Sequence, residues 1–352
     1  MYEIIPIIII IACLSIKFLM KESYEKAFLQ ALNIIHKNYI KKIQLKNLVY
    51  DSLKKILSSL DSNSYFLTPT EYKLMLQNKF INIGIKIKVE DRPRITSICE
   101  NSLAKKAGLK VNDIILEINN KSTKNMDLTE INKIIKSNEQ INLLIKRDNK
   151  VKKLNLQLVA SDVIEEKIID NQYIYIRIFY FEKNVSKKFI KTINELRRKY
   201  PIKGIILDLR NNFGGLLDEA IEIANKFIDS GKIIIYIKKR HKKKEVIANG
   251  TTKFHYPLIV LIDKGTISSA EALAASLQDH HKAILIGKPS FGKDSIQTIF
   301  ELKDGSALWI TTGYFIRPNG QSIKDKGVMP DLIVEDNLIN VALKVLKRNI
   351  DI

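Results

Sequence analysis

The chain has 352 residues, of which 45% are hydrophobic and 27% are charged. This balance excludes an intrinsically disordered protein, and the length is sufficient for two domains with a sizeable buried core. The formal net charge of +20 is compatible with a nucleic acid or an anionic membrane as partner, but the lysines are spread along the whole chain. We attribute the excess to compositional bias and expect no nucleic-acid partner.

The chain begins with an apolar run from Ile4 to Leu14, which continues past Lys17. The run is shorter and more interrupted than the about 20 apolar residues of a membrane-spanning helix, but it matches the core of a signal peptide. Lys17 and Lys21 follow the run, which argues against export under the positive-inside rule. We expect residues 1–20 to be a signal peptide or an uncleaved signal anchor that associates the protein with a membrane.

Helical periodicity characterises the next region, residues 21–78. Apolar residues recur at spacings of three and four in 24–35 and again in 48–57, which predicts amphipathic helices. A polar break over 59–66 then precedes Thr68-Pro69, a pair typical of a helix start.

A second pattern, residues 79–160, predicts a small separate domain. Apolar residues alternate with polar ones, as in half-buried strands, and about 80 residues are enough for a complete domain. We expect strands at 83–89, 95–98, 114–118, 141–145 and 154–158, with helices at 102–109 and 128–135.

The third region, residues 161–352, alternates continuous apolar strands with helices, which predicts an α/β core. The expected strands are 174–178, 205–207, 233–237, 258–262 and 284–286, and the expected helices are 185–196, 216–227 and 269–277. Shorter strands at 299–300, 309–312 and 332–334 indicate a mixed edge. The basic run 238–244 lies between strand-like segments and indicates a solvated hairpin tip.

Cysteine and histidine usage predicts neither a disulfide framework nor a metal site. The two cysteines are Cys13, within the N-terminal apolar run, and Cys99. The histidines have no ligand spacing, and the adjacent pair His280-His281 would not converge on one metal from a helix. We therefore expect no metal.

Two short segments carry the chemistry. Gly265–Glu271 directly follows a predicted apolar strand, so that a strand-to-helix turn exposes hydroxyl groups. Phe291–Gln297 contains Lys293, with an amide side chain four residues later. An exposed serine and a lysine that can lose its charge are the minimum for serine/lysine acyl transfer. On their own, Ser268 is equally typical of a turn or helix cap, Ser269 is an alternative nucleophile, and Lys293 is typical of a surface.

A Ser-His-Asp triad is the alternative arrangement in the same region. Asp279 precedes His280 and His281, but all three lie about three helical turns beyond Ser268 and point elsewhere. We reject this arrangement.

Several separated blocks resemble, in order, those of carboxyl-terminal processing proteases, the serine/lysine family that includes tail-specific proteases. The resemblance runs from about Tyr24 to Glu335. Its blocks are 60–69, 83–85, 102–109, 113–115, 208–217, 265–271, 278–280, 291–297, 304–308, 318–320 and 326–331. The resemblance implies a mixed α/β protein with a helical N-terminal region (21–78), an inserted PDZ domain (79–160) and a core similar to ClpP and crotonase (161–352).

The resemblance also implies catalytic roles. Ser268, the fourth residue of the glycine-led motif, is the nucleophile, and Lys293, 25 positions further on, is its base. A lysine must be neutral to accept a proton, and burial in apolar surroundings lowers its pKa towards that state. Gln297 would hold the amine by a hydrogen bond without adding charge. Asp294 stands where the family usually has glycine, and a carboxylate there would hold the charge of Lys293, although alternation in a strand would point the two side chains apart.

Other departures from the family pattern are Phe213, Ile267 and Ala270.

The oxyanion donors implied are the backbone N–H groups of Ser269 and Gly214. Gly214 and Gly215 alternatively serve a turn that needs positive φ, and both interpretations can hold together. We expect Asp208 and Arg210 to form a structural ion pair near this loop.

For the PDZ domain, the resemblance implies binding of an extended peptide by strand addition. The amides of Ile83, Gly84 and Ile85 would bind the free carboxylate, and Leu128 and Ile131 would form a side-chain pocket. The alternative is that these residues fill a small core.

Together these features predict a serine endopeptidase of the bacterial cell envelope, on the periplasmic side of the inner membrane. It would bind proteins with free C-termini, cleave near them through an acyl-enzyme and need no cofactor, with the PDZ domain gating activity. Whether it is a monomer or a homodimer is left open by the sequence. The alternatives are a catalytically decayed PDZ adaptor and a crotonase-like acyl-CoA enzyme.

Overall fold

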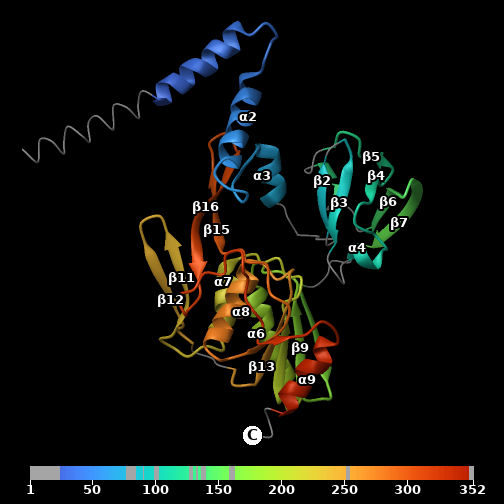
Figure 1. Ribbon diagram of the computed structural model, residues 1–352, viewed down its shortest axis with the longest axis vertical. Coiled ribbons are helices and arrows are strands. Elements are labelled where there is room, and N and C mark those ends of the chain that lie inside the picture. The colour runs from blue at the N-terminus through green and yellow to red at the C-terminus, as the bar shows by residue number, and fades with distance from the viewer. Residues whose placement is uncertain are drawn as a thin grey trace, which may run out of the picture. The chain divides into compact units, whose positions relative to one another are not determined.

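The computed structural model describes residues 24–76, 85–89, 91–98, 103–126, 130–131, 134–135, 140–157, 163–250 and 254–348 (Figure 1). It is a mixed α/β protein, as predicted. Two compact units divide the chain: one contains residues up to Tyr72 together with Thr298–Ile310, and the other contains Lys73–Gln297 and Thr311–Ile352. None of the helices in the described ranges is long and apolar enough to span a bilayer.

The first unit combines N-terminal helices with strands from far along the sequence. It contains a helix over 24–38, α2 (Leu45–Ser58), β1 (Tyr65–Leu67) and the start of α3 (Pro69–Leu76). The first two helices were predicted from apolar periodicity and α3 from its Thr68-Pro69 start, whereas β1 was not predicted. β1 pairs antiparallel with the first residues of β16 (Ala307–Ile316). The ring of Tyr65 stacks on that of Trp309 with centroids 5.5 Å apart, and the Tyr50 hydroxyl donates to Asp304 at 2.7 Å.

The predicted small domain is a sheet of short strands in the order β2-β3-β4-β6-β7, with β5 beside β4. Its elements are β2 (Ile85–Val89), β3 (Pro93–Ile98), α4 (Leu103–Lys106), β4 (Ile114–Ile118), β5 (Lys121–Ser122), β6 (Gln140–Arg147) and β7 (Lys150–Gln157). Ile115, Ile118 and Ile141 are fully buried in its core. A bidentate ion pair between Arg147 and Asp113, with N–O distances of 2.7 Å, joins the end of β6 to the turn before β4.

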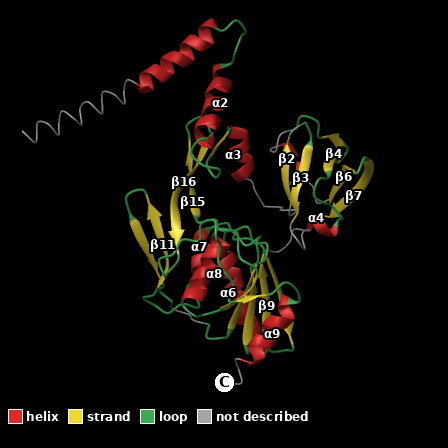
Figure 2. Cartoon of the chain, in the orientation of Figure 1, coloured by secondary structure: helices red, strands yellow, loops and turns green. Residues whose placement is uncertain are grey.

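The second unit also contains a six-stranded sheet in the order β17-β14-β13-β10-β9-β8. β9 (Tyr173–Ile178), β10 (Gly204–Asp208), β13 (Leu258–Ile262), β14 (Ile284–Gly287) and β17 (Leu332–Ile333) run parallel, and β8 (Ile164–Ile169) is antiparallel at the edge. Helices cover both faces (Figure 2). α6 (Val185–Lys199), α7 (Leu217–Ala224) and α8 (Ser269–Asp279) pack on one face, and α9 (Leu338–Arg348) packs on the other.

Residues of each central strand alternate between these two faces. Ile205 and Leu207 belong to the core under α6, α7 and α8, whereas Ile206 between them packs towards Leu338 and Leu346 of α9. Burial on both faces explains why the strands are continuously apolar. The carboxyl ends of β10 and β13 then lie together, and the loops that follow them carry Gly214 and Ser268, whereas Lys293 follows β14.

A third sheet has the order β1-β16-β11-β12, with β15 (Ser295–Glu301) beside β16. β11 (Ile233–Lys239) and β12 (Lys243–Ile247) form the predicted hairpin, and residues 238–245 are all exposed. β11 also pairs with β16, with Lys239 opposite Gly313.

Candidate active site

Ser268 lies at the sharp turn between β13 and α8. Its backbone has φ 60° and ψ −117°, a conformation that side-chain-bearing residues rarely adopt, and α8 begins at the next residue. Such a turn presents a serine hydroxyl at the carboxyl edge of a parallel sheet. Ser268 is half-buried, whereas the hydroxyl of Ser269 is buried and has no hydrogen-bond partner in the described chain. The accessible hydroxyl is therefore that of Ser268.

One buried carboxylate connects this turn to the lysine segment. Glu271 is 0% exposed, and its Oε2 accepts hydrogen bonds from the backbone N–H of Ser268 at 2.8 Å and of Lys293 at 2.9 Å. Its Oε1 accepts from the N–H of Gly292 and from the Ser290 hydroxyl, both at 2.6 Å. Burial raises the pKa of Glu271, and the four donors oppose that rise. The sequence prediction gave Glu271 no role, although the Ser-x-x-Glu spacing of a capping box was visible.

Lys293 and Asp294 precede β15, so the strand alternation predicted for them is wrong. Lys293 is half-buried, and Asp294 is 6% exposed. A carboxylate oxygen of Asp294 accepts from the Ser322 hydroxyl at 2.8 Å, and its backbone carbonyl accepts from the N–H of Phe315 at 2.9 Å. The Asp294 side chain is therefore held by a neutral hydroxyl.

Gln297 lies on β15 and is fixed by two hydroxyl groups. Its amide nitrogen donates to Ser295 at 2.9 Å and to Thr311 at 3.2 Å. The carbonyl oxygen is the only acceptor on this side chain, so it is the atom to which a lysine amine would donate. The contact between Gln297 and Lys293 stays a prediction.

The glycine loop after β10 packs directly against the nucleophile turn. Gly214 has φ +89°, and a Cβ there would lie 2.8 Å from the Ile267 carbonyl and 2.9 Å from the Ser268 Cβ. The Ile267 N–H donates to the Asn212 carbonyl at 2.9 Å, which joins the two loops. Only glycine fits this position.

The two predicted oxyanion donors differ in whether their N–H groups are already hydrogen-bonded. The Gly214 N–H donates to the side-chain oxygen of Asn212 at 2.9 Å, so it is engaged within its own loop. The Ser269 N–H, the first of α8, makes no hydrogen bond within the described residues. Both oxyanion roles stay predictions. To bind an oxyanion, the Gly214 N–H would have to share or exchange its hydrogen bond to Asn212.

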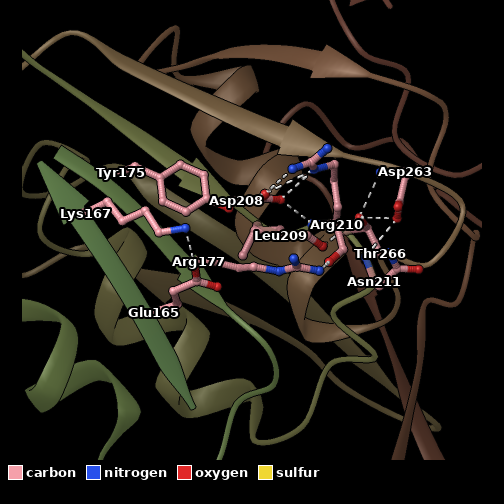
Figure 3. A network of polar contacts seen from close by, with 10 residues as sticks. All are labelled: Glu165, Lys167, Tyr175, Arg177, Asp208, Leu209, Arg210, Asn211, Asp263 and Thr266. Atoms are coloured by element: carbon pink, nitrogen blue, oxygen red, sulfur yellow. Dashed lines mark hydrogen bonds and ion pairs between the residues drawn. The ribbon is translucent and has the colours of Figure 1, made fainter. Parts of the chain in front are cut away.

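The predicted ion pair between Asp208 and Arg210 is confirmed (Figure 3). Asp208 is 0% exposed, and its carboxylate accepts from the Arg210 guanidinium at 2.6 Å and from the Tyr175 hydroxyl at 2.8 Å. Burial raises the pKa of the Tyr175 hydroxyl, and the Asp208 carboxylate raises it further. The Arg177 guanidinium donates to the Arg210 carbonyl at 3.2 Å.

A second set of polar contacts joins the loops after β10 and β13 (Figure 3). Asp263 accepts from the N–H of Asn211 at 2.9 Å and of Gly265 at 2.8 Å, and the Thr266 hydroxyl donates to the Leu209 carbonyl at 2.9 Å. Burial raises the pKa of Asp263, and the two amides oppose that rise. The glycine loop and the nucleophile loop are thus held together independently of the catalytic side chains.

Comparison with known proteins identifies the family. Residues 172–334 match peptidase family S41, and residues 94–147 match the PDZ domain. A carboxy-terminal-processing protease of Bartonella bacilliformis is 32% identical over 311 residues, covering 83% of this chain and 71% of the relative. The carboxy-terminal processing protease CtpA of Bacillus subtilis is 32% identical over 326 residues, covering 87% and 68% respectively.

The chain belongs to the S41 family of carboxy-terminal processing proteases. Among solved structures, the photosystem II D1 C-terminal processing protease has the same fold, with a TM-score of 0.64 and 22% identity over 91% of this chain and 95% of that one.

The remaining polar groups on α8 of this protease support the rejection of a histidine triad. Asp279 forms an ion pair with Arg317 and accepts from the Asn319 amide at 3.0 Å. The ring Nε2 of His280 hydrogen-bonds the carbonyl of Ile233 at 2.7 Å. These groups stabilise the end of α8, and their hydrogen bonds go to partners other than Ser268.

Of the predicted PDZ residues, Ile83, Gly84 and Leu128 lie outside the described residues. Ile85 begins β2, is half-buried and pairs with Ile98 of β3. Ile131 is 0% exposed within the PDZ core, so packing accounts for its presence there. Because β2 pairs with β3 alone among the described strands, its other edge is the place where a peptide strand would add.

Proposed function

We propose that the protease hydrolyses polypeptides near their C-termini through an acyl-enzyme on Ser268, with Lys293 as the general base. The observation that carries this assignment is the shared contact of Ser268 and Lys293 with one oxygen of Glu271. That contact brings together two segments that are 25 positions apart in the sequence.

In this mechanism, the Ser268 hydroxyl oxygen attacks the scissile carbonyl carbon while neutral Lys293 takes the hydroxyl proton. The protonated amine then delivers that proton to the departing amine as the C–N bond breaks, which leaves an ester on Ser268. Water, deprotonated by Lys293, attacks the ester carbonyl, and the proton returns to the Ser268 oxygen as the product acid leaves.

Backbone N–H groups stabilise the oxyanion that forms in both steps. Ser269 supplies one, at the N-terminus of an 11-residue helix whose dipole also favours negative charge. Gly214 supplies the other after exchange of its bond to Asn212. Gln297 holds the Lys293 amine through its carbonyl oxygen, while Ser295 and Thr311 fix the plane of its amide.

The PDZ domain binds the free carboxylate end of the substrate along β2 and gates the active site. We further propose association with the periplasmic side of a bacterial inner membrane through residues 1–20, and a homodimer. The apolar sequence of that segment supports the membrane assignment. N-terminal sequencing of the protein from the membrane fraction tests it, because recovery only in soluble fractions contradicts it.

The catalytic assignment is tested with Ser268→Ala and Lys293→Ala in the full chain. A tailed protein substrate is incubated with each variant, and the new C-termini are measured by mass spectrometry. We expect both variants to lose cleavage by at least about a thousandfold, because the nucleophile and base act as a unit. Equal activity in the wild type and either variant overturns the mechanism and favours a PDZ adaptor or another site.

A further inference from the structure

The β11–β12 hairpin concentrates positive charge at one end of the sheet with the order β1-β16-β11-β12. Its turn is Arg240-His241, closed by a hydrogen bond from the Lys239 N–H to the Lys242 carbonyl at 2.7 Å. Six exposed cations surround this turn: Lys238, Lys239, Arg240, Lys242, Lys243 and Lys244. Figure 1 shows the hairpin as a separate pair of strands beside β16. We refer to these six side chains as the basic hairpin.

The basic hairpin gathers its cations at one turn. Some exposed lysines elsewhere have carboxylate partners, as in Lys282–Asp229 at 2.9 Å, Lys288–Glu335 at 3.4 Å and Lys347–Asp170 at 2.8 Å. In the described chain, by contrast, none of the six hairpin cations forms an ion pair.

Within the hairpin, like charges also face one another. Lys238 lies directly opposite Lys243, an arrangement that destabilises an antiparallel pair. The ammonium of Lys243 lies 3.7 Å from the centre of the Tyr236 ring, and the single acidic residue on either strand is Glu245, opposite Tyr236. Folding alone does not require this charge, because like charges that face one another destabilise the hairpin.

The strand register places the hairpin turn near β16 and β15, the strands that carry Thr311 and Gln297. Lys239 pairs with Gly313 on β16, and a Cβ on Gly313 would lie 3.5 Å from the Lys239 Cγ. Because β11 and β16 are antiparallel, the turn at Arg240 continues towards the level of Thr311. The hydroxyl of Thr311 accepts from the Gln297 amide at 3.2 Å.

Gln297 lies on β15, the strand beside β16. Two strand spacings of about 4.8 Å therefore separate the basic hairpin from the strand that follows Lys293. Two spacings are about 9.6 Å, slightly more than the Debye length of about 8 Å at physiological ionic strength, so salt weakens the positive potential of the hairpin at β15 without abolishing it.

We propose that the basic hairpin is a substrate-binding exosite, which selects polypeptides that carry a cluster of aspartate or glutamate residues next to the scissile bond. This inference rests on the proposed function and adds a substrate class to it. The six cations lower the KM for such a segment by holding it while the neighbouring residues lie across Ser268. The aromatic side chains of the hairpin are Tyr236 and His241, and the Tyr236 ring is covered by Lys243, so the hairpin offers no run of rings on which successive nucleic-acid bases could stack.

The test compares three fluorogenic peptides with one C-terminal tail and one cleavage sequence. Four residues that flank the scissile bond are all glutamate, all glutamine or all lysine. For the wild-type full chain we expect kcat/KM to be about tenfold higher for the acidic peptide than for the neutral one, which corresponds to about 1.4 kcal/mol. The difference should lie in KM and should disappear at high salt.

Neutralising the basic hairpin, with all six cations changed to glutamine, should remove this preference and leave cleavage of the neutral peptide unchanged. A matched control neutralises six exposed cations at other places on the core: Lys191, Arg198, Lys199, Lys203, Lys344 and Lys347. The control has the same net charge and should keep the acidic preference. Thermal unfolding of both variants verifies that they fold.

Two outcomes overturn the proposal. In the first, the wild type does not prefer the acidic peptide, or the hairpin variant keeps the preference. In the second, the hairpin variant loses binding to vesicles containing anionic lipid, or to an oligonucleotide, but keeps its peptide preference. A failure of the catalytic assignment looks different, because Ser268→Ala would then still cleave the neutral peptide.

Discussion

Replacing Glu271 by glutamine tests whether one carboxylate positions both catalytic groups. All four neighbours of this carboxylate are hydrogen-bond donors: three backbone N–H groups and the Ser290 hydroxyl. Glutamine keeps one accepting oxygen and replaces the other with an NH2 group, which cannot accept. Glu271→Gln therefore loses either the bonds to Ser268 and Lys293 or the bond to Gly292, with the Ser290 hydroxyl turned to accept from the new NH2 group.

The size of the effect follows from these contacts. Leaving a buried donor without an acceptor costs about 1–3 kcal/mol, so the loss of one or two acceptor contacts destabilises the folded core by about 1–6 kcal/mol. Removing the cost of burying a charge offsets part of this loss. A displacement of about 1 Å between Ser268 and Lys293 lowers the rate about a hundredfold. We expect kcat to fall by about that factor with KM nearly unchanged, because the change affects positioning of the reacting groups.

The pH dependence gives a second readout. Burial raises the pKa of Glu271, so in the wild type this group protonates above the usual carboxyl range. Protonation places a hydrogen on an oxygen that has to accept one, so activity should fall as the pH decreases through this pKa. The free energy of unfolding changes in the opposite direction. Because the pKa of Glu271 is higher in the folded state, this group stabilises the fold fully at low pH, and that stabilisation is lost as the pH rises through the folded-state pKa.

The matched control is Glu219→Gln. Glu219 accepts from the N–H of Asn184 at 2.8 Å and of Ser186 at 2.9 Å, so it holds the start of α6. It follows Gly214 by five positions, but its hydrogen bonds go to Asn184 and Ser186 and not to the segments of Ser268 and Lys293. Steady-state kinetics and urea unfolding are measured for both variants. The control should lose stability and keep kcat. The reasoning fails if Glu271→Gln retains wild-type kcat, or if both variants lose activity in proportion to their stability.

Two further substitutions test the surroundings of the nucleophile. Gly214→Ala should lower activity by about a hundredfold or more, because its Cβ would meet the Ile267 carbonyl and displace the glycine loop from Ser268. Near-normal hydrolysis of a tailed peptide would show that the loop does not need glycine. Arg210→Met should destabilise the fold by about 3–5 kcal/mol in urea unfolding, because it leaves the buried Asp208 without its cation. A loss below about 1 kcal/mol would show that the Tyr175 hydroxyl and backbone contacts suffice for that carboxylate.

Much of the fold was predictable because its central strands are buried on both faces. β10 and β13 were predicted from continuous apolar runs, and the helices from their apolar spacing. β8 was not predicted, since an edge strand containing Glu165, Glu166 and Lys167 lacks that signal. β1 was not predicted because three residues are too few for a period to show. α9 was also missed, although Leu338, Ala342 and Leu346 recur every four residues and are buried.

The candidate site was predictable as a set of residue types, but its connections were not. Motif spacing identified Ser268 and Lys293, and the structure joins their segments through Glu271, whose role no spacing within either segment revealed. The bond from Gly214 to Asn212 depends on the loop conformation, which sequence alone does not define. The position of Asp294 beside Lys293 predicted that its carboxylate would hold the lysine charge. The carboxylate instead accepts from Ser322, which lies 28 positions away and could not be identified as its partner from the sequence.

The pairing of β1 with β16 has a consequence for how the protein is made. Tyr50 and Asp304, joined by a hydrogen bond, are 254 positions apart, and Tyr65 stacks on Trp309 over a similar separation. The N-terminal helices leave the ribosome first, yet their strand partners emerge only after the PDZ domain and most of the core have been synthesised. The earliest part of the chain is thus among the last to complete its fold, so a nascent protease would acquire this unit only near the end of translation.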